Sequence, residues 1–184
     1  MSAATRAFAA SFTIHGLFAR AAVTGFDAGQ WGARVPIPAG PSPESAQEAL
    51  NHAVWQFAHL TEVRGNIARA LGAELPSPER VGADFGDPCH DASAYPSGPD
   101  LLEEFCALGE TIVARLASID PAHFDEPYSP EFPDGRPRTI AEAIPFLVTH
   151  EALHIGQLSL LRRLNGHGGI AQAALAMMDA AEGK

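Results

Sequence analysis

The fifteen prolines of this chain are gathered in three clusters, and this distribution limits where regular secondary structure can form. Four prolines lie within residues 36–43, five within 76–99 and five within 121–137, while Pro145 stands alone. A proline inside a helix removes a backbone hydrogen bond and clashes with the preceding turn, so clusters of proline mark connections. The proline-free stretches therefore predict four long helices.

The first two stretches have the apolar spacing of amphipathic helices. A helix over about residues 3–28 would place apolar side chains on one face, three or four positions apart. The second helix is expected to run from Pro43 to Leu71, with Ser42 as its N-cap and Gly72 after its last turn. The face of the first helix consists of Phe8, Phe12, His15, Ala19, Ala22 and Phe26.

The third and fourth stretches predict two further helices and a short one after them. The third helix is expected over about Pro99–Ile119. The fourth begins at Thr139, where Thr139 and Glu142 have the spacing of a capping box. Pro145 lies within the first two turns of this helix, so we expect a bend there. A glycine-rich break then leads to a short helix over about residues 170–182.

Together these elements predict an all-α four-helix bundle with a short extra C-terminal helix. A chain of 184 residues is expected to form a single domain, here residues 1–184. The loops over 73–99 and 120–138 are longer than the usual connections in bundles. The loop over 73–99, which joins the second and third helices, is long enough to let these two helices run parallel.

The charge and the cysteines exclude some classes of function and favour a compartment. Twelve basic against twenty-two acidic residues give a net charge of −10, which disfavours binding to nucleic acid. No stretch is long and apolar enough to span a bilayer, and residues 7–19 are too polar for the core of an export signal. Cys89 and Cys106 are too few for a disulfide framework, so we expect a cytoplasmic protein.

Two histidines on the inner face of the fourth helix predict a metal site. His150 and His154 are one turn apart, so both imidazoles can reach a single ion. Neutral imidazole suits zinc, nickel or iron. Gln157 lies one turn further along the same face. Buried polar groups need partners, and a shared metal ion would supply one.

The third ligand is expected from another helix, and the residue pattern leaves three candidates. His59 ranks first because it lies nearest the middle of the second helix, with Glu62 one turn away to orient it. His15 of the first helix ranks second, and if it is not a ligand we expect it to line a cavity. His52 ranks third, and if it is not a ligand we expect it on the surface. A separate alternative brings Cys89, His90 and Asp91 to the metal from the long loop.

The segment from His150 to His154 also satisfies the HExxH pattern of zinc peptidases, in which Glu151 would be the general base. Two observations weigh against this alternative. Position 160, where a third histidine could follow, is a leucine, and no predicted strand is available to pair with a peptide substrate. A peptidase is therefore the minor alternative.

Three segments of the chain resemble the DinB/YfiT superfamily of metal-dependent proteins. They are the HExxHxGQ portion within Thr139–Gly166, the sequence WQFAHL over Trp55–Leu60, and the connection over Gln30–Ser42. The resemblance extends to about residue 166. It implies a bundle of up-down-down-up topology, a homodimer, and a metal triad of His59, His150 and His154.

The resemblance also implies an activity, because three histidines leave one coordination position open to water or substrate. Characterised relatives include transferases and isomerases that use low-molecular-weight thiols. We expect a divalent transition metal, with zinc or nickel first and iron or manganese next, that activates water or a thiol toward a small-molecule substrate. His15, Glu62, Glu151 and Gln157 are the expected neighbours of the site. The competing hypothesis is a non-catalytic dimeric bundle whose metal site is structural or sensing.

Overall fold

The computed structural model describes residues 2–36, 49–75, 91–130, 132 and 134–183. Within these ranges it is all-helical and contains no β-strand, only two isolated bridges that join Pro36 to Ala49 and Pro127 to Thr139. No helix in the described part of the chain is long and apolar enough to cross a membrane. The helices are α1 (Ala3–Val23), α2 (Ala28–Gly32), α3 (Ala53–Ala70), α4 (Gly98–Ser118), α5 (Ile140–Leu164) and α6 (Ile170–Ala181), with short 3-10 turns η1 (Ala92–Ala94) and η2 (Pro121–Asp125).

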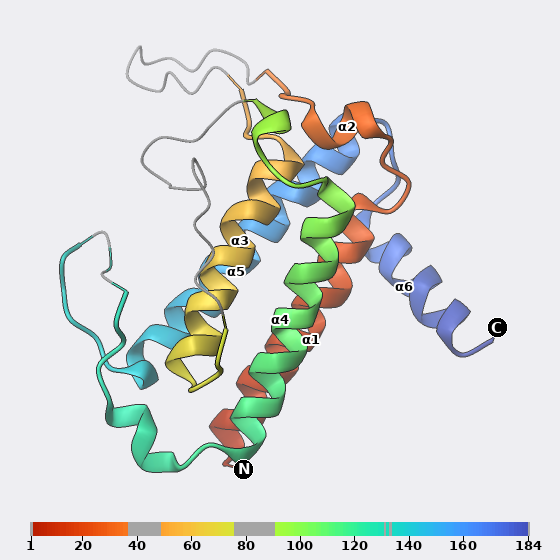
Figure 1. Cartoon of the computed structure of the whole chain (residues 1–184). Coiled ribbons are helices and arrows are strands. Elements are labelled where there is room, and N and C mark those ends of the chain that lie inside the picture. The colour runs from red at the N-terminus through yellow and green to blue at the C-terminus, as the bar shows by residue number, and fades with distance from the viewer. Residues whose placement is uncertain (1, 37–48, 76–90, 131, 133, 184) are drawn as a thin grey trace, which may run out of the picture.

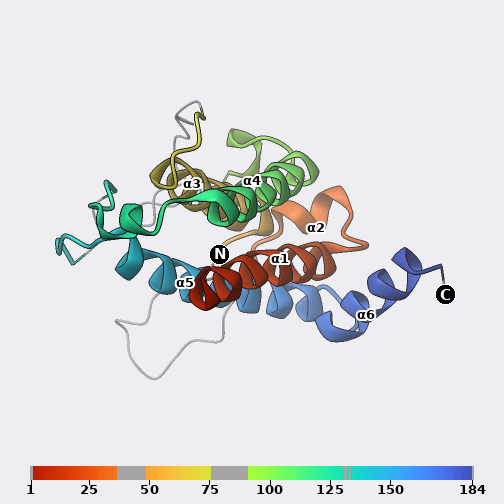
Figure 2. The same ribbon diagram turned by 90° about the horizontal axis from the view of Figure 1, so that it is seen from below.

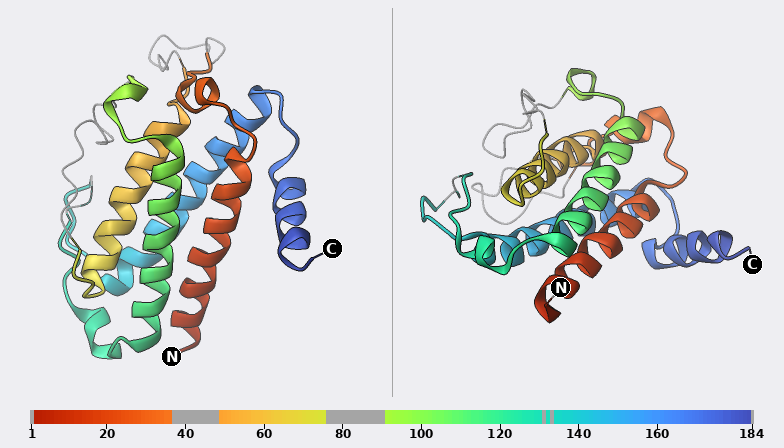
Figure 3. Two further views of the ribbon diagram at one scale, coloured as in Figure 1. Left: turned by 45° about the vertical axis from the view of Figure 1, so that its right-hand side comes forward. Right: turned by 60° about the horizontal axis from the view of Figure 1, so that its bottom comes forward.

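Four long helices, α1, α3, α4 and α5, lie side by side (Figure 1). The neighbouring pairs are α1 with α4, α4 with α3, α3 with α5, and α5 with α1. Seen from below, α3 and α4 lie on one side and α1 and α5 on the other (Figure 2). Helices α3 and α4 descend in Figure 1 while α1 and α5 rise, and α6 lies outside the group beside α1 (Figure 3).

The helix ends follow the capping signals of the sequence in most places. Thr139 and Glu142 form the predicted capping box at the start of α5. Helix α1 is shorter than expected, because the chain turns after Val23 at Gly25, where φ is +85°. Helix α5 continues through Pro145 to Leu164. The predicted third helix and the short C-terminal helix are present within one residue of their expected bounds.

The expected start of the second helix was wrong. Helix α3 begins at Ala53, and its N-cap is His52, whose Nδ1 accepts a hydrogen bond from the backbone N–H of Trp55 at 2.9 Å. The preceding residues are extended, since Ala49 pairs with Pro36. The predicted cap at Ser42 and Pro43 lies outside the described residues. An imidazole therefore supplies the acceptor that we had expected from a serine hydroxyl.

The core consists of two apolar clusters separated by a polar layer. One cluster surrounds Trp55 and Phe57 near α2, and the other surrounds Phe12 and Ile67 toward the opposite end. Arg64 lies between them, fully buried. Charged groups are rarely buried unless they are paired, so this layer must be held by specific partners.

Candidate metal centre

Three imidazoles from two helices converge at one point on the α3/α5 side of the bundle. The Nε2 atom of His150 lies 3.3 Å from Nε2 of His59 and 3.1 Å from Nε2 of His154. One ligand atom from each residue lies within 4.8 Å of the others. His154 is buried, whereas His59 and His150 are half-buried. Helix α5 contributes two of these groups because residues four apart lie on one face, as the sequence predicted.

Two of the three separations among these nitrogens match the spacing of a tetrahedral metal site. A zinc–nitrogen bond of about 2.0–2.1 Å implies ligand atoms roughly 3.3 Å apart in a tetrahedron. Burial lowers the pKa of His150, although the charge of Glu151 opposes this effect. The pKa of His154 is lowered to about 3, mainly by burial and secondly by the positive charges of His59 and His150 when they are protonated. Both shifts favour the neutral form of the imidazole, which is the form that binds metal.

Gln56 fixes the orientation of His154. Its Oε1 atom forms a short hydrogen bond with Nδ1 of His154, and its Nε2 atom donates to Oε1 of Gln157 at 2.7 Å. Because an amide oxygen can only accept, His154 carries its proton on Nδ1 and presents the Nε2 lone pair to the other histidines. The sequence prediction included Gln157 but missed Gln56. Its position, one turn before His59 on the same helix, was the signal that could have identified it.

Aromatic rings hold the other two imidazoles. Trp55 stacks on His59 with ring centroids 5.2 Å apart and an interplanar angle of 3°. Phe146 lies nearly parallel to His150, with centroids 6.5 Å apart. These contacts restrict the rotation of both rings, so much of the arrangement is preformed.

Glu151, which lies between His150 and His154 in α5, belongs to the buried polar layer. Its oxygens accept hydrogen bonds from Nε and Nη2 of Arg64 at 2.8 and 2.6 Å, and from Nδ1 of His15 at 2.9 Å. Burial alone would raise the pKa of Glu151, but the hydrogen bonds from Arg64 and then His15 outweigh it, and the pKa lies below its usual value. A carboxylate held in this way is poorly placed to take a proton from water, which weighs against the peptidase alternative.

The remaining candidates lie apart from the three converging imidazoles. His15 binds Glu151, so it contributes to the polar layer. His52 caps α3 and is fully buried, so the expectation of a surface residue was wrong. Glu62 is half-buried one turn after His59, and its role in orienting that ring stays a prediction. Cys89 and His90 lie outside the described residues, and Asp91 accepts hydrogen bonds from Ser93.

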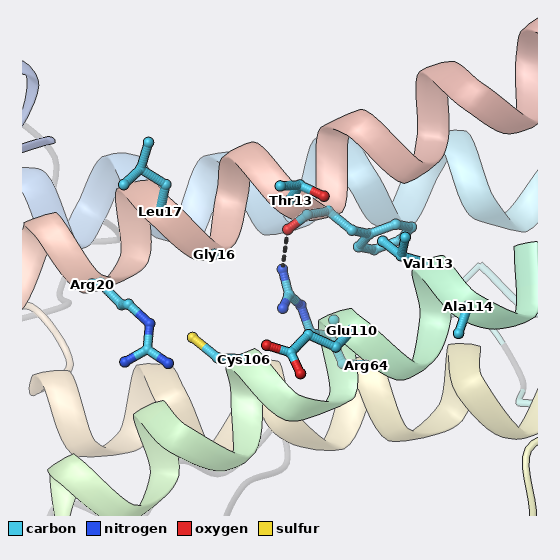
Figure 4. A pocket seen from close by; sticks show the side chains of 11 residues that line it. Thr13, Gly16, Leu17, Arg20, Arg64, Cys106, Glu110, Val113 and Ala114 are labelled. Atoms are coloured by element: carbon cyan, nitrogen blue, oxygen red, sulfur yellow. Dashed lines mark hydrogen bonds between the residues drawn. The ribbon is translucent and has the colours of Figure 1, made fainter. Parts of the chain in front are cut away.

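A separate cavity of about 400 Å³ opens between α1 and α4 (Figure 4). Gly16 and Arg20 line it from α1, and Cys106 and Glu110 line it from α4. The guanidinium of Arg64 reaches into the space between the two helices and donates to the carbonyl oxygen of Phe12 at 3.2 Å. The polar layer thus extends from Glu151 beside the three histidines to the wall of this cavity.

A family model described as the DinB superfamily matches residues 18–158 of the chain. The search of curated proteins found no match to this chain. The matched segment includes His59, His150 and His154 and covers well over half of the sequence, as expected from the HExxHxGQ and WQFAHL segments. The chain therefore belongs to the DinB superfamily.

Proposed function

We propose that this protein is a metal-dependent enzyme in which His59, His150 and His154 hold one divalent transition metal ion. The observation that carries the proposal is the convergence of three imidazoles, in which Nε2 of His150 lies 3.3 Å from Nε2 of His59 and 3.1 Å from Nε2 of His154, close to the spacing of a tetrahedral site. Three neutral nitrogen donors favour zinc or nickel first, and iron or manganese next. When bound at such a site, the ion supplies Lewis acidity and leaves a coordination position for water or the sulfur of a low-molecular-weight thiol.

The chain's own residues supply orientation and a fixed protonation state. Gln56 holds the proton of His154 on Nδ1, so the lone pair on Nε2 of His154 can bind a metal ion. Trp55 fixes the plane of the His59 ring. The reaction that fits this arrangement best is hydrolysis, or transfer of a thiol, with a small-molecule substrate.

The proposal extends to fold type, assembly and location. We infer the up-down-down-up bundle of the superfamily, supported by the opposite directions of the α3/α4 and α1/α5 pairs (Figure 1). We also propose a homodimer. Three further statements stay predictions from the sequence. The protein is cytoplasmic, residues 1–184 form one domain, and neither nucleic acid nor a membrane is a partner.

The first test measures metal. Protein purified without a histidine tag should contain, or take up, one equivalent of zinc or nickel by elemental analysis and titration. His154→Ala should lose this binding, whereas His167→Ala should retain it, because His167 instead bonds to Gln30 at 3.0 Å. Absence of stoichiometric binding in the wild type, or unchanged affinity in His154→Ala, would contradict the proposal.

The second test measures turnover. Metal-loaded protein is incubated with a panel of electrophiles and low-molecular-weight thiols, and separately with small esters and amides, and products are identified by mass spectrometry. A conjugate or hydrolysis product that disappears in His154→Ala supports the enzyme. Bound metal without any turnover favours the alternative of a structural or sensing site in a non-catalytic bundle.

A further inference from the structure

The side of α5 that faces away from the bundle exposes large apolar side chains. Phe146 is 47% exposed, Leu153 64%, Leu160 47% and Leu164 52%. Among the described residues, only seven large hydrophobic side chains are exposed, and these are four of them. The opposite face of α5 is buried against α1 and α3. A helix that is apolar on both sides is usually covered on both sides.

Along most of its length this outer face of α5 also lacks charge of its own. Between Glu142 and Arg162, the only charged residue is Glu151, which is fully buried. Solvated protein surfaces usually have about 25–35% charged residues. Ala152 and Gly156 lie beside the apolar side chains, and a side chain added at Gly156 would meet nothing within 4 Å. Small residues at these positions would let another helix approach closely.

Together with His150 and Gln157, the four exposed apolar residues follow the spacing of a coiled-coil seam. Successive members of this set are four, three, four, three and four residues apart, which is the heptad spacing of helices that pack against a second helix. The α5 stripe consists of Phe146, His150, Leu153, Gln157, Leu160 and Leu164.

The order of these intervals is the same from either end of the helix. An identical helix laid antiparallel therefore brings every member of the stripe opposite another member. Phe146 would face the partner subunit's Leu164, His150 the partner's Leu160, and Leu153 the partner's Gln157. A surface that is complementary to itself in this way is what a two-fold symmetric dimer requires.

We propose that the α5 stripe is the interface of the homodimer, with the α5 helices of two copies packed antiparallel. This inference rests on the homodimer proposed above. The four apolar side chains expose roughly 400 Å² together, taking about 200 Å² for a fully exposed large side chain. A standard interface buries about 800 Å² per partner, a little over half of it apolar. The stripe and its polar neighbours are therefore large enough for a stable dimer.

The interface would also complete the surroundings of the metal centre. His150 is a member of the α5 stripe and one of the three converging imidazoles. Its half-buried edge would pack against the partner subunit's Leu160, so the second copy forms one wall of the approach to the metal. Sites at the boundary between packed units are common for small-molecule ligands.

The first experiment measures mass in solution by analytical ultracentrifugation of the full chain. The wild type should be a dimer, and Leu160→Glu should raise the dissociation constant by about 100-fold or more. Leu175→Glu is the matched control, because Leu175 is 60% exposed but lies on α6. It should remain dimeric, and circular dichroism should show that both variants keep their helices. A monomeric wild type, a dimeric Leu160→Glu, or dissociation by Leu175→Glu would overturn the proposal.

A second experiment tests the antiparallel register through a disulfide. In a background where Cys89 and Cys106 are replaced by serine, the double variant Phe146→Cys, Leu164→Cys should form covalent dimers under mild oxidation. Each single variant should not, because residues 146 and 164 are about 27 Å apart along the helix. Efficient cross-linking of Phe146→Cys alone would indicate parallel pairing and contradict the proposal. Metal content measured on the same samples keeps this result separate from the proposed function, since either can fail while the other holds.

Discussion

Glu151 and Arg64 form an ion pair in the middle of the bundle, and both side chains are fully buried. Arg64 belongs to α3 and Glu151 to α5, and two further donors of Arg64 bond to the carbonyl oxygens of Phe12 in α1 and Phe105 in α4. One guanidinium therefore connects all four long helices. The glutamate of the HExxH pattern is thus part of the scaffold that positions its neighbour, His150.

Glu151→Gln should cost more stability than a typical surface change. The substitution removes the charge that compensates Arg64, and leaving one member of a buried pair uncompensated costs about 3–5 kcal/mol. The free energy of unfolding, measured by urea denaturation of the metal-free protein, should fall by roughly this amount.

The matched control for Glu151→Gln is Glu103→Gln. Glu103 also accepts two hydrogen bonds from one arginine, Arg20, at 2.6 and 3.1 Å, but it lies on the surface. Solvent screens such a pair, so the control should unfold almost as the wild type does. Equal effects of the two substitutions would refute a structural role for the buried pair.

Gly109→Ala tests how closely α4 approaches Arg64. A Cβ atom at Gly109 would lie 2.3 Å from Nη1 of Arg64, so the buried guanidinium would have to move. We expect a loss of roughly 1–3 kcal/mol in unfolding free energy, as for other overpacked cores. Gly16→Ala, at a helical position where nothing lies within 4 Å, should instead gain about 0.5–1 kcal/mol. A neutral Gly109→Ala would show that the guanidinium can relocate without cost.

The long helices and the histidine pair of α5 could be predicted because their signals are local, whereas His59 could only be ranked first among three candidates from other helices. The i, i+4 spacing of His150 and His154 and the capping box at Thr139 each occupy a few residues of one helix. Arg64 could not be predicted, because its partners come from residues 12, 105 and 151, which only the folded chain brings together. The start of α3 was misplaced because the sequence around Ser42 and Pro43 suggested a cap, whereas the cap in the structure is His52.

Alkylation of Cys106 should need a more alkaline solution than that of an ordinary thiol. Burial raises the pKa of Cys106 above its usual 9.0, although Arg20 and Arg64 oppose this effect. Because the thiolate is the nucleophile, a raised pKa lowers the reactive fraction at any pH below it. In a Cys89→Ser variant, the rate of iodoacetamide labelling should still be rising steeply with pH at about pH 9, where an unperturbed cysteine thiol is already largely ionised. A plateau at or below this pH would mean that the thiol is not desolvated in the wall of the α1/α4 cavity.

Gln56→Leu should weaken metal binding without removing any of the three imidazoles. The Oε1 atom of Gln56 holds the proton of His154 on Nδ1, and leucine cannot do so. The ring is then free to adopt the tautomer with its proton on Nε2, which has no lone pair on that atom and cannot bind metal through it. Loss of such an outer hydrogen bond typically costs about 10–100-fold in affinity.

Gln56→Glu separates this effect from a change in packing, since a carboxylate keeps an acceptor for Nδ1 of His154 but loses the donor to Gln157. Zinc affinity, measured by competition with a chelator, should fall in the leucine variant and be largely retained in the glutamate variant. Nitrogen chemical shifts of the metal-free proteins provide a readout that does not depend on metal. His154 should be protonated on Nδ1 in the wild type and in Gln56→Glu, and should populate the other tautomer in Gln56→Leu. If all three proteins share one tautomer and one affinity, the orientation of His154 is set by its packing against Trp55 and not by Gln56.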